Sequence, residues 1–214
     1  MQQSKDHLTS LRPEQSHGGQ AELEAVINHL IGKVQTTTLV KVVAVRATGV
    51  APVGTLDVQP LVHQIDGSGT IVNLGVVYDV PYFRLQGGAN AVICDPVVGD
   101  LGICLFASRD ISAVKRNKAA SAPDSRRQYD WSDGLYIGGV LNGYPSQYVF
   151  FSDSGIKIVT PNGVDINAGG DVSINAGGDV NIFSSNLSHN GKNVGDSHTH
   201  SGISPGGSNT GVPN

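Results

Sequence analysis

Two histidines near the end of the chain, His198 and His200, have the clearest capacity for metal chemistry. One residue separates them, so on an extended segment both imidazoles point to the same side. A single exposed pair is a weak metal site, and two such histidines are normally just solvated. Three copies of the pair, converging on a threefold axis, would offer six imidazole nitrogens.

Six nitrogen ligands suit an octahedral ion. Structural zinc prefers four ligands, and magnesium or calcium prefers oxygen. We therefore predict Fe as the cofactor, one ion per trimer with six histidine ligands from three chains, and nickel or cobalt as substitutes. The ion would be structural, because a six-coordinate site leaves no open position for a substrate.

Other chemistry is sparse in the 214 residues. Glutamate occurs only at positions 14, 22 and 24, and no aspartate stands in a catalytic context, so we expect no enzyme. A net charge of -4 and 6% aromatic residues argue against a nucleic-acid partner. Cys94 and Cys104 lie in apolar, strand-like runs and are interpreted as small buried hydrophobic residues.

The histidines must be positioned by what precedes them, an eight-residue repeat that starts at residue 148. The blocks are YVFFSDSG, IKIVTPNG, VDINAGGD, VSINAGGD, VNIFSSNL and SHNGKNVG, and the first five carry apolar residues at positions one and three. Residues i and i+2 of a strand face the same way, so each of these octads presents two apolar side chains to one side. The Gly and Asn residues that follow suit a corner, because they accept positive φ.

One chain cannot close such a repeat, because two turns of a three-sided solenoid leave open strand edges above and below. Three chains wound together would pair those edges and place a stripe of Val and Ile on the threefold axis. We therefore predict an intertwined, triple-stranded β-helix over residues 148–196 in a homotrimer, with a metal-capped apex over 197–214.

The first half of the chain predicts a different structure. Residues 1–34 form a polar arm and a short helix whose apolar stripe runs from Leu23 to Ile31. We expect this helix to pack on its own domain, with a contact between subunits as the alternative. Short β-branched runs between turn signals over 35–112 predict an N-terminal OB-fold barrel, so the fold class is all-β.

Residues 113–147 are interpreted as a connector. Five basic residues lie in or near it: Lys115, Arg116, Lys118, Arg126 and Arg127. A nucleic-acid patch is conceivable, but a solvated linker or pairing with acids of a neighbouring subunit is the preferred interpretation.

These stretches resemble the central spike proteins of contractile tails, the baseplate assembly protein V or membrane-piercing spike family, in the forms with a Gp138-like N-terminal domain. The resemblance covers roughly residues 35–214 and is carried by TTTLVKVVAV, VVGDLGICLFASRDI, RRQYDWSDG, the octads and the ending HTHSGISPGGSNTGVP. It implies a trimer with an OB-fold, a triple-stranded β-helix and an iron-stabilised tip held by residues that match His198 and His200.

The resemblance also implies a function and partners. The barrel end would attach to hub or baseplate proteins, and the protein would be located in the virion, at the tail baseplate tip. On sheath contraction the spike would cross the host outer membrane, without enzymatic activity. The alternatives are a spike of a related contractile secretion or bacteriocin system, or a trimeric receptor-binding adhesin.

Overall fold

The protein is described by a computed structural model, which describes residues 19–66, 68–196, 198–199, 202 and 206. The chain divides into two compact units, Met1–Tyr148 and Val149–Asn214. The boundary lies between Tyr148, which is the first residue of the octads, and Val149. None of the helices among the described residues is long and apolar enough to cross a bilayer.

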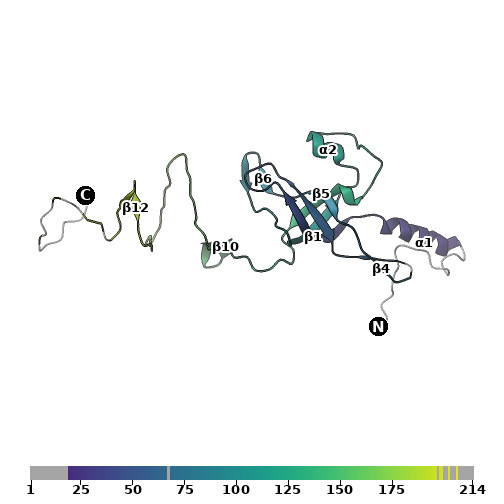
Figure 1. Ribbon diagram of the computed structural model, residues 1–214, viewed down its shortest axis with the longest axis horizontal. Helices are drawn as coiled ribbons and strands as arrows, with labels where there is room; N and C mark the ends of the chain where they lie inside the picture. Colours follow the sequence, from purple (N-terminus) through teal and green to yellow (C-terminus); the bar gives the residue numbers. More distant parts are fainter. Residues whose placement is uncertain (1–18, 67, 197, 200–201, 203–205, 207–214) are drawn as a thin grey trace. The chain divides into compact units, whose positions relative to one another are not determined.

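Short strands dominate the first unit (Figure 1). Its helical elements are α1 (Gly19–Gly32), α2 (Ser112–Asn117) and the 3-10 turn η2 (Trp131–Asp133). Its strands are β1 (Thr37–Arg46), β2 (Thr55–Pro60), β3 (Gln64–Ile65), β4 (Ile71–Val72), β5 (Val77–Pro81), β6 (Leu85–Gly87), β7 (Asn90–Val92), β8 (Leu101–Phe106) and β9 (Gly134–Gly138). The all-β class predicted from the sequence is confirmed.

Five of these strands form one antiparallel sheet in the order β5-β2-β1-β8-β9. The sheet curls until its two edges meet, where Tyr82 forms a parallel bridge with Tyr136. The backbone N–H of Phe83 donates to the carbonyl of Tyr136 at 2.8 Å and closes this contact. β3 pairs with β4, and β6 with β7, as separate two-stranded hairpins.

The core lies inside the curl and follows the alternation of the strands. Val40 and Val42 of β1, Leu56 and Val58 of β2, and Tyr136 of β9 are among its fully buried side chains. β-branched residues suit this pleated, half-buried surface, which is why these runs form strands.

Tyr136 needs two glycines beside it. A Cβ at position 102 would lie 2.5 Å from the Tyr136 ring, and a Cβ at position 138 would lie 3.1 Å from it. Gly102 and Gly138 are paired across β8 and β9, so the large ring lies over a gap that only glycine leaves open.

The position of β9 corrects the predicted domain limits. The sheet does not end at residue 112, because β9 pairs with β8 from Gly134 to Gly138. Residues 113–147 are therefore not simply a connector, since part of that stretch is the edge strand. Two glycines border the short run Leu135–Ile137, so its strand signal in the sequence is weak.

The helix α1 also differs from its preferred prediction. Its apolar side chains, Leu23, Val26, Ile27, Leu30 and Ile31, are 44–61% exposed. The predicted packing of this stripe on its own domain is therefore wrong, and the helix presents an uncovered apolar face.

The two cysteines differ in environment. Cys104 is buried as predicted, and burial raises the pKa of its thiol to about 12. The prediction of burial is wrong for Cys94, which lies two residues after β7 and is exposed. The apolar run around Cys94 does not enter the core, because β6 and β7 form a separate hairpin.

We expect a thiol reagent such as DTNB at pH 8 to modify one cysteine per folded chain, because only Cys94 is accessible. Denaturation should expose the second thiol, and a Cys94→Ser variant should react only when unfolded. Rapid modification of Cys104 in the folded protein would contradict the buried position of β8.

The second unit contains little regular structure within the single chain. β10 (Tyr148–Ser152) pairs with β11 (Gly155–Val159), and β12 (Ser188–His189) pairs with β13 (Lys192–Asn193). Between these hairpins, no described residue from 160 to 187 belongs to a strand. The octads over residues 164–187 therefore form no strand within the chain that carries them.

Candidate functional site

The predicted metal ligands lie at the end of the second unit. His198 is exposed, whereas His200 lies outside the described residues. The His198 backbone N–H donates to the carbonyl of Gly195 at 3.2 Å, and its ring Nδ1 lies 2.6 Å from the same oxygen. A carbonyl oxygen can only accept, so Nδ1 carries the proton of this hydrogen bond.

This tautomer fits a metal ligand. Histidines that bind metals usually donate the other ring N–H to a carbonyl or carboxylate, which fixes the ring and its lone pair. Within the part of the chain that the structure describes, no three His, Cys, Asp or Glu side chains cluster as a metal site. A shared site of three chains therefore stays a prediction.

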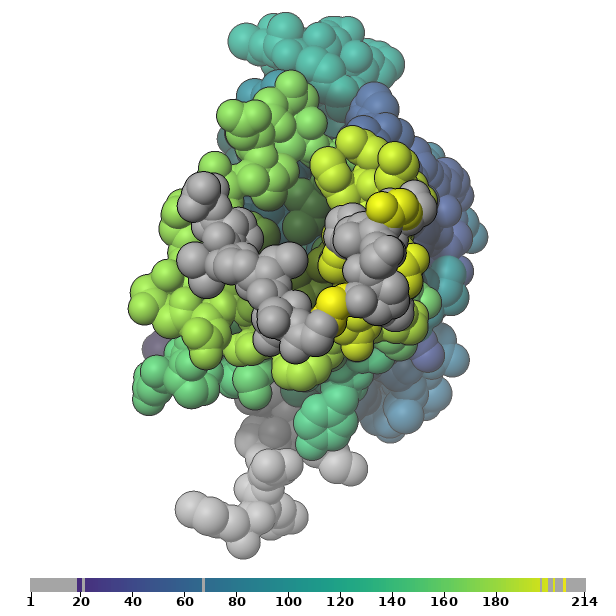
Figure 2. Space-filling view, turned by 90° about the vertical axis from the view of Figure 1, so that its left-hand side faces the viewer, coloured from purple at the N-terminus to yellow at the C-terminus, as the bar shows by residue number. Residues whose placement is uncertain are grey.

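A groove runs beside His198. It has a volume of about 730 Å³ and is lined mainly by the segment from Ile182 to Leu187 and by Asn193 to Asp196. Figure 2 shows the green to yellow segments of this unit as open turns around a hollow. The chain thus leaves space beside the predicted ligand that its own side chains do not fill.

The octad side chains form the longest uncovered apolar series of the protein. Positions one and three of the two central octads, Val164, Ile166, Val172 and Ile174, are 59–76% exposed. Monomeric soluble proteins rarely expose large contiguous apolar surfaces, and those that do usually use them as interaction sites. The repeated spacing therefore marks a contact surface.

The basic residues of the predicted connector have partners in their own chain. Arg127 Nη2 lies 2.6 Å from Asp110 Oδ1, and Arg127 Nε lies 2.9 Å from Asp133 Oδ2. Arg116 pairs with Asp124 at 2.7 Å on the surface. For these two arginines, the predicted solvated linker or intersubunit pairing is replaced by ion pairs within the chain.

The Arg127 cluster holds the loop between β8 and β9. Both carboxylate side chains are fully buried, whereas Arg127 is 31% exposed. The hydroxyl of Ser125 donates to Asp110 at 2.7 Å, and this bond, with further bonds and the charge of Arg127, lowers the pKa of Asp110. Asp133 also accepts from the backbone N–H of Ile111 at 3.0 Å. Each carboxylate is committed to structure.

A second cluster joins the loops after β1 and β7. Arg84 donates to Asp95 at 2.7 Å and to the carbonyl of Ala51 at 2.7 Å, and Tyr82 donates to Asp95 at 2.8 Å. A hydrogen bond from the Gly49 backbone, followed by the Arg84 guanidinium, lowers the pKa of Asp95. No local sequence pattern predicts this pairing, because its members are scattered over three loops.

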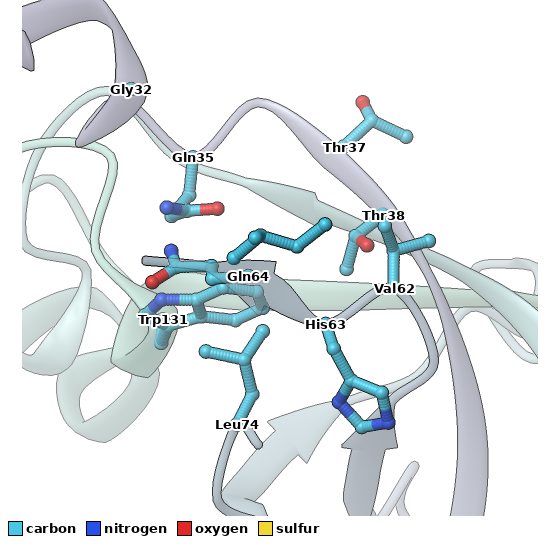
Figure 3. A pocket seen from close by; sticks show the side chains of 10 residues that line it. Gly32, Gln35, Thr37, Thr38, Val62, His63, Gln64, Leu74 and Trp131 are labelled. Carbon is cyan, nitrogen blue, oxygen red and sulfur yellow. The ribbon is translucent and has the colours of Figure 1, made fainter. Parts of the chain in front are cut away.

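One small cavity lies beside the start of β1 (Figure 3). Its volume is about 290 Å³, and Leu74, Val62 and Trp131 line it together with the polar side chains of Gln35 and His63. Trp131 also packs edge-on against Phe106, with ring centroids 5.0 Å apart. The described residues of this lining include no hydrogen-bonded pair of nucleophile and base.

Comparison with known proteins gives one family match. Residues 50–139 match the model of the phage protein Gp138 N-terminal domain. A search among curated proteins found no match. The matched stretch begins just before β2 and ends just after β9, so it spans four strands of the five-stranded sheet and includes the edge strand beyond residue 112. The match fits a structural component of a virion. Residues 50–139 are therefore similar to the N-terminal domain of the phage protein Gp138.

Proposed function

We propose that three copies of this chain form a membrane-piercing spike at the tip of a contractile phage tail. The first unit would be an OB-fold domain that attaches to hub or baseplate proteins, and the octads would wind into a triple-stranded β-helix. The spike would act mechanically and without catalysis at the host outer membrane. The match to a phage protein domain supports the phage origin over the secretion and bacteriocin alternatives.

The octads carry this proposal. Their Val and Ile side chains keep a fixed spacing and are exposed in the single chain, and the described residues from 160 to 187 form no strand there. Three intertwined chains would bury these side chains and pair this backbone. Backbone edges would pair on the faces of the column, and the apolar side chains would meet on its axis. Strands spaced about 4.8 Å apart would then build a narrow column on the order of 30 Å long.

His198 and His200 would hold an iron ion at the tip. The ring Nδ1 of His198 lies 2.6 Å from the carbonyl oxygen of Gly195, and this contact orients the ring. A bound ion would cross-link three chain ends where the apolar octads stop. Because it would bind only the folded trimer, it would stabilise that trimer by mass action.

Light scattering and elemental analysis test the proposal together. We expect a solution mass of three chains and about one iron per trimer. A His198→Ala, His200→Ala double variant should stay trimeric, lose the iron and unfold at lower temperature. A monomeric wild-type chain would contradict the spike, and an unchanged iron content in the variant would contradict the metal site alone.

A further inference from the structure

The outer face of the five-stranded sheet carries an apolar patch. Val40, Cys104 and Tyr136 point into the core, so their strand neighbours point outward. Outward residues pair directly across the strands, Leu39 with Ile103 and Ile103 with Ile137, and Leu105 with Leu135. We call Leu39, Ile103, Leu105, Leu135 and Ile137 the outer patch.

None of these five side chains is fully covered. Leu105, Leu135 and Ile137 are 37–42% exposed, and Leu39 and Ile103 are half-buried. Antiparallel sheets with one solvated face normally alternate apolar and polar residues. This part of the sheet is apolar on both faces, which indicates that another element covers the outer one.

We infer that α1 of a neighbouring copy covers the outer patch. This inference rests on the trimer of the proposed function. The apolar stripe of α1 is another uncovered face of the first unit, and a helix packed on a sheet is a standard way for two such faces to be buried. Each of these two apolar surfaces would cover the other.

The two surfaces match in size and charge. The stripe from Leu23 to Ile31 is about 12 Å long at 1.5 Å per residue. The patch spans three strands, about 10 Å across. Lys41 of β1 lies beside the patch, paired with Leu101 of β8, and α1 carries Glu22 and Glu24 near its start, so opposite charges flank the two surfaces.

The linker to β1 favours a neighbouring copy over the chain's own helix. The N–H groups of Lys33 and Val34 continue the helical bonding to Leu30 and Ile31. Gln35 donates to the carbonyl of Tyr129 at 3.2 Å, and Thr36 accepts from Phe106 at 3.0 Å. Folding α1 back onto its own sheet would require a reversal within this bonded segment, whereas a neighbour's helix disrupts none of these bonds.

Threefold symmetry makes the contact self-consistent. A contact between two different surfaces of identical chains forms a closed ring when the rotation between neighbours closes. In a trimer each copy would give one helix and receive one, so all three stripes and all three patches would be buried.

Disulfide trapping in the full chain tests the inference. In a Cys94→Ser background, Ile27→Cys places a thiol in the stripe and Ile137→Cys places one in the patch. We expect mild oxidation to give covalent dimers and trimers on a non-reducing gel. The matched control replaces Asn28, which lies off the stripe, in place of Ile27, and should cross-link at least tenfold more slowly. Light scattering of the reduced proteins records the assembly.

Each remaining outcome contradicts the inference in a distinct way. A disulfide within one chain would show that α1 covers its own sheet. Cross-linked dimers from Ile27→Cys alone would show that the helices pack on one another. A trimer that cross-links no faster than its control would overturn this contact but leave the spike standing, whereas a monomer would overturn both.

Discussion

Replacing Ile166 and Ile174 together by aspartate is expected to abolish the trimer. Both side chains are about three-quarters exposed in the single chain, at 76% and 75%, and occupy the third position of the two central octads. In a three-chain column each would face the axis, so the variant would bury six carboxylates without cations. An unpaired buried charge is so unfavourable that the chains should separate instead. Size-exclusion chromatography with light scattering should give the mass of one chain.

The neighbouring polar positions provide the control. Ser173 lies between two octad apolar positions and is predicted to face outward, so Ser173→Asp adds the same side chain on the solvent face. We expect this variant to remain trimeric, with stability within about 0.5 kcal/mol of wild type. A trimer that survives the double substitution, or is lost equally in the control, would show that the octads do not form the axial core.

We expect the first unit to stay folded in the monomeric double variant. The core of the five-stranded sheet lies wholly within the Met1–Tyr148 unit, and the octads lie almost wholly in the other. The circular dichroism of the sheet should therefore persist. This separates loss of assembly from general misfolding.

The sheet illustrates what a sequence can indicate and what it cannot. The β-branched run TTLVKVVAVR predicts β1, and its buried residues Val40 and Val42 face the core. The strand β9 has a weak signal because GLYIG contains two glycines, and one of them, Gly134, leaves room for Cys104 of β8, since a Cβ at position 134 would lie 2.7 Å from the Cys104 sulfur. The requirement for that glycine comes from a strand far away in the chain, so no local pattern can reveal it.

Charge pairing was missed for the same physical reason. The sequence shows five basic residues in the predicted connector, residues 113–147. A run of like charges normally indicates a solvent-exposed segment. Arg127 instead bonds to Asp110, in the loop after β8, and to Asp133, in the turn η2. Octad spacing needs no such distant information, because it is set by the strand period itself. The spacing of His198 and His200 alone predicts them as metal ligands. Only three assembled chains could bring six such rings together.

Replacing Arg127 by alanine is expected to be the most destabilising single change in the first unit. It removes the cation from two carboxylates whose side chains are completely buried. Breaking a buried ion pair from one side costs about 3 kcal/mol or more, because the remaining charges stay buried without compensation. Arg127 is itself 31% exposed, so we expect the low end of that range. Urea unfolding followed by circular dichroism measures the change.

Arg116→Ala is the matched control, because it breaks an ion pair with Asp124 whose side chains are 62% and 43% exposed. A surface pair contributes about 0–1 kcal/mol, so the two arginine variants should differ clearly.

The pKa of Asp110 is lowered in the folded protein, so its ionised form stabilises the fold above the ordinary value of 3.8, and this contribution is lost as the pH falls toward the lowered pKa. The deficit of Arg127→Ala should therefore be full at pH 7 and shrink in acid below pH 3.8. An equal deficit in both variants, or one independent of pH, would show that the cluster does not hold the β8–β9 loop.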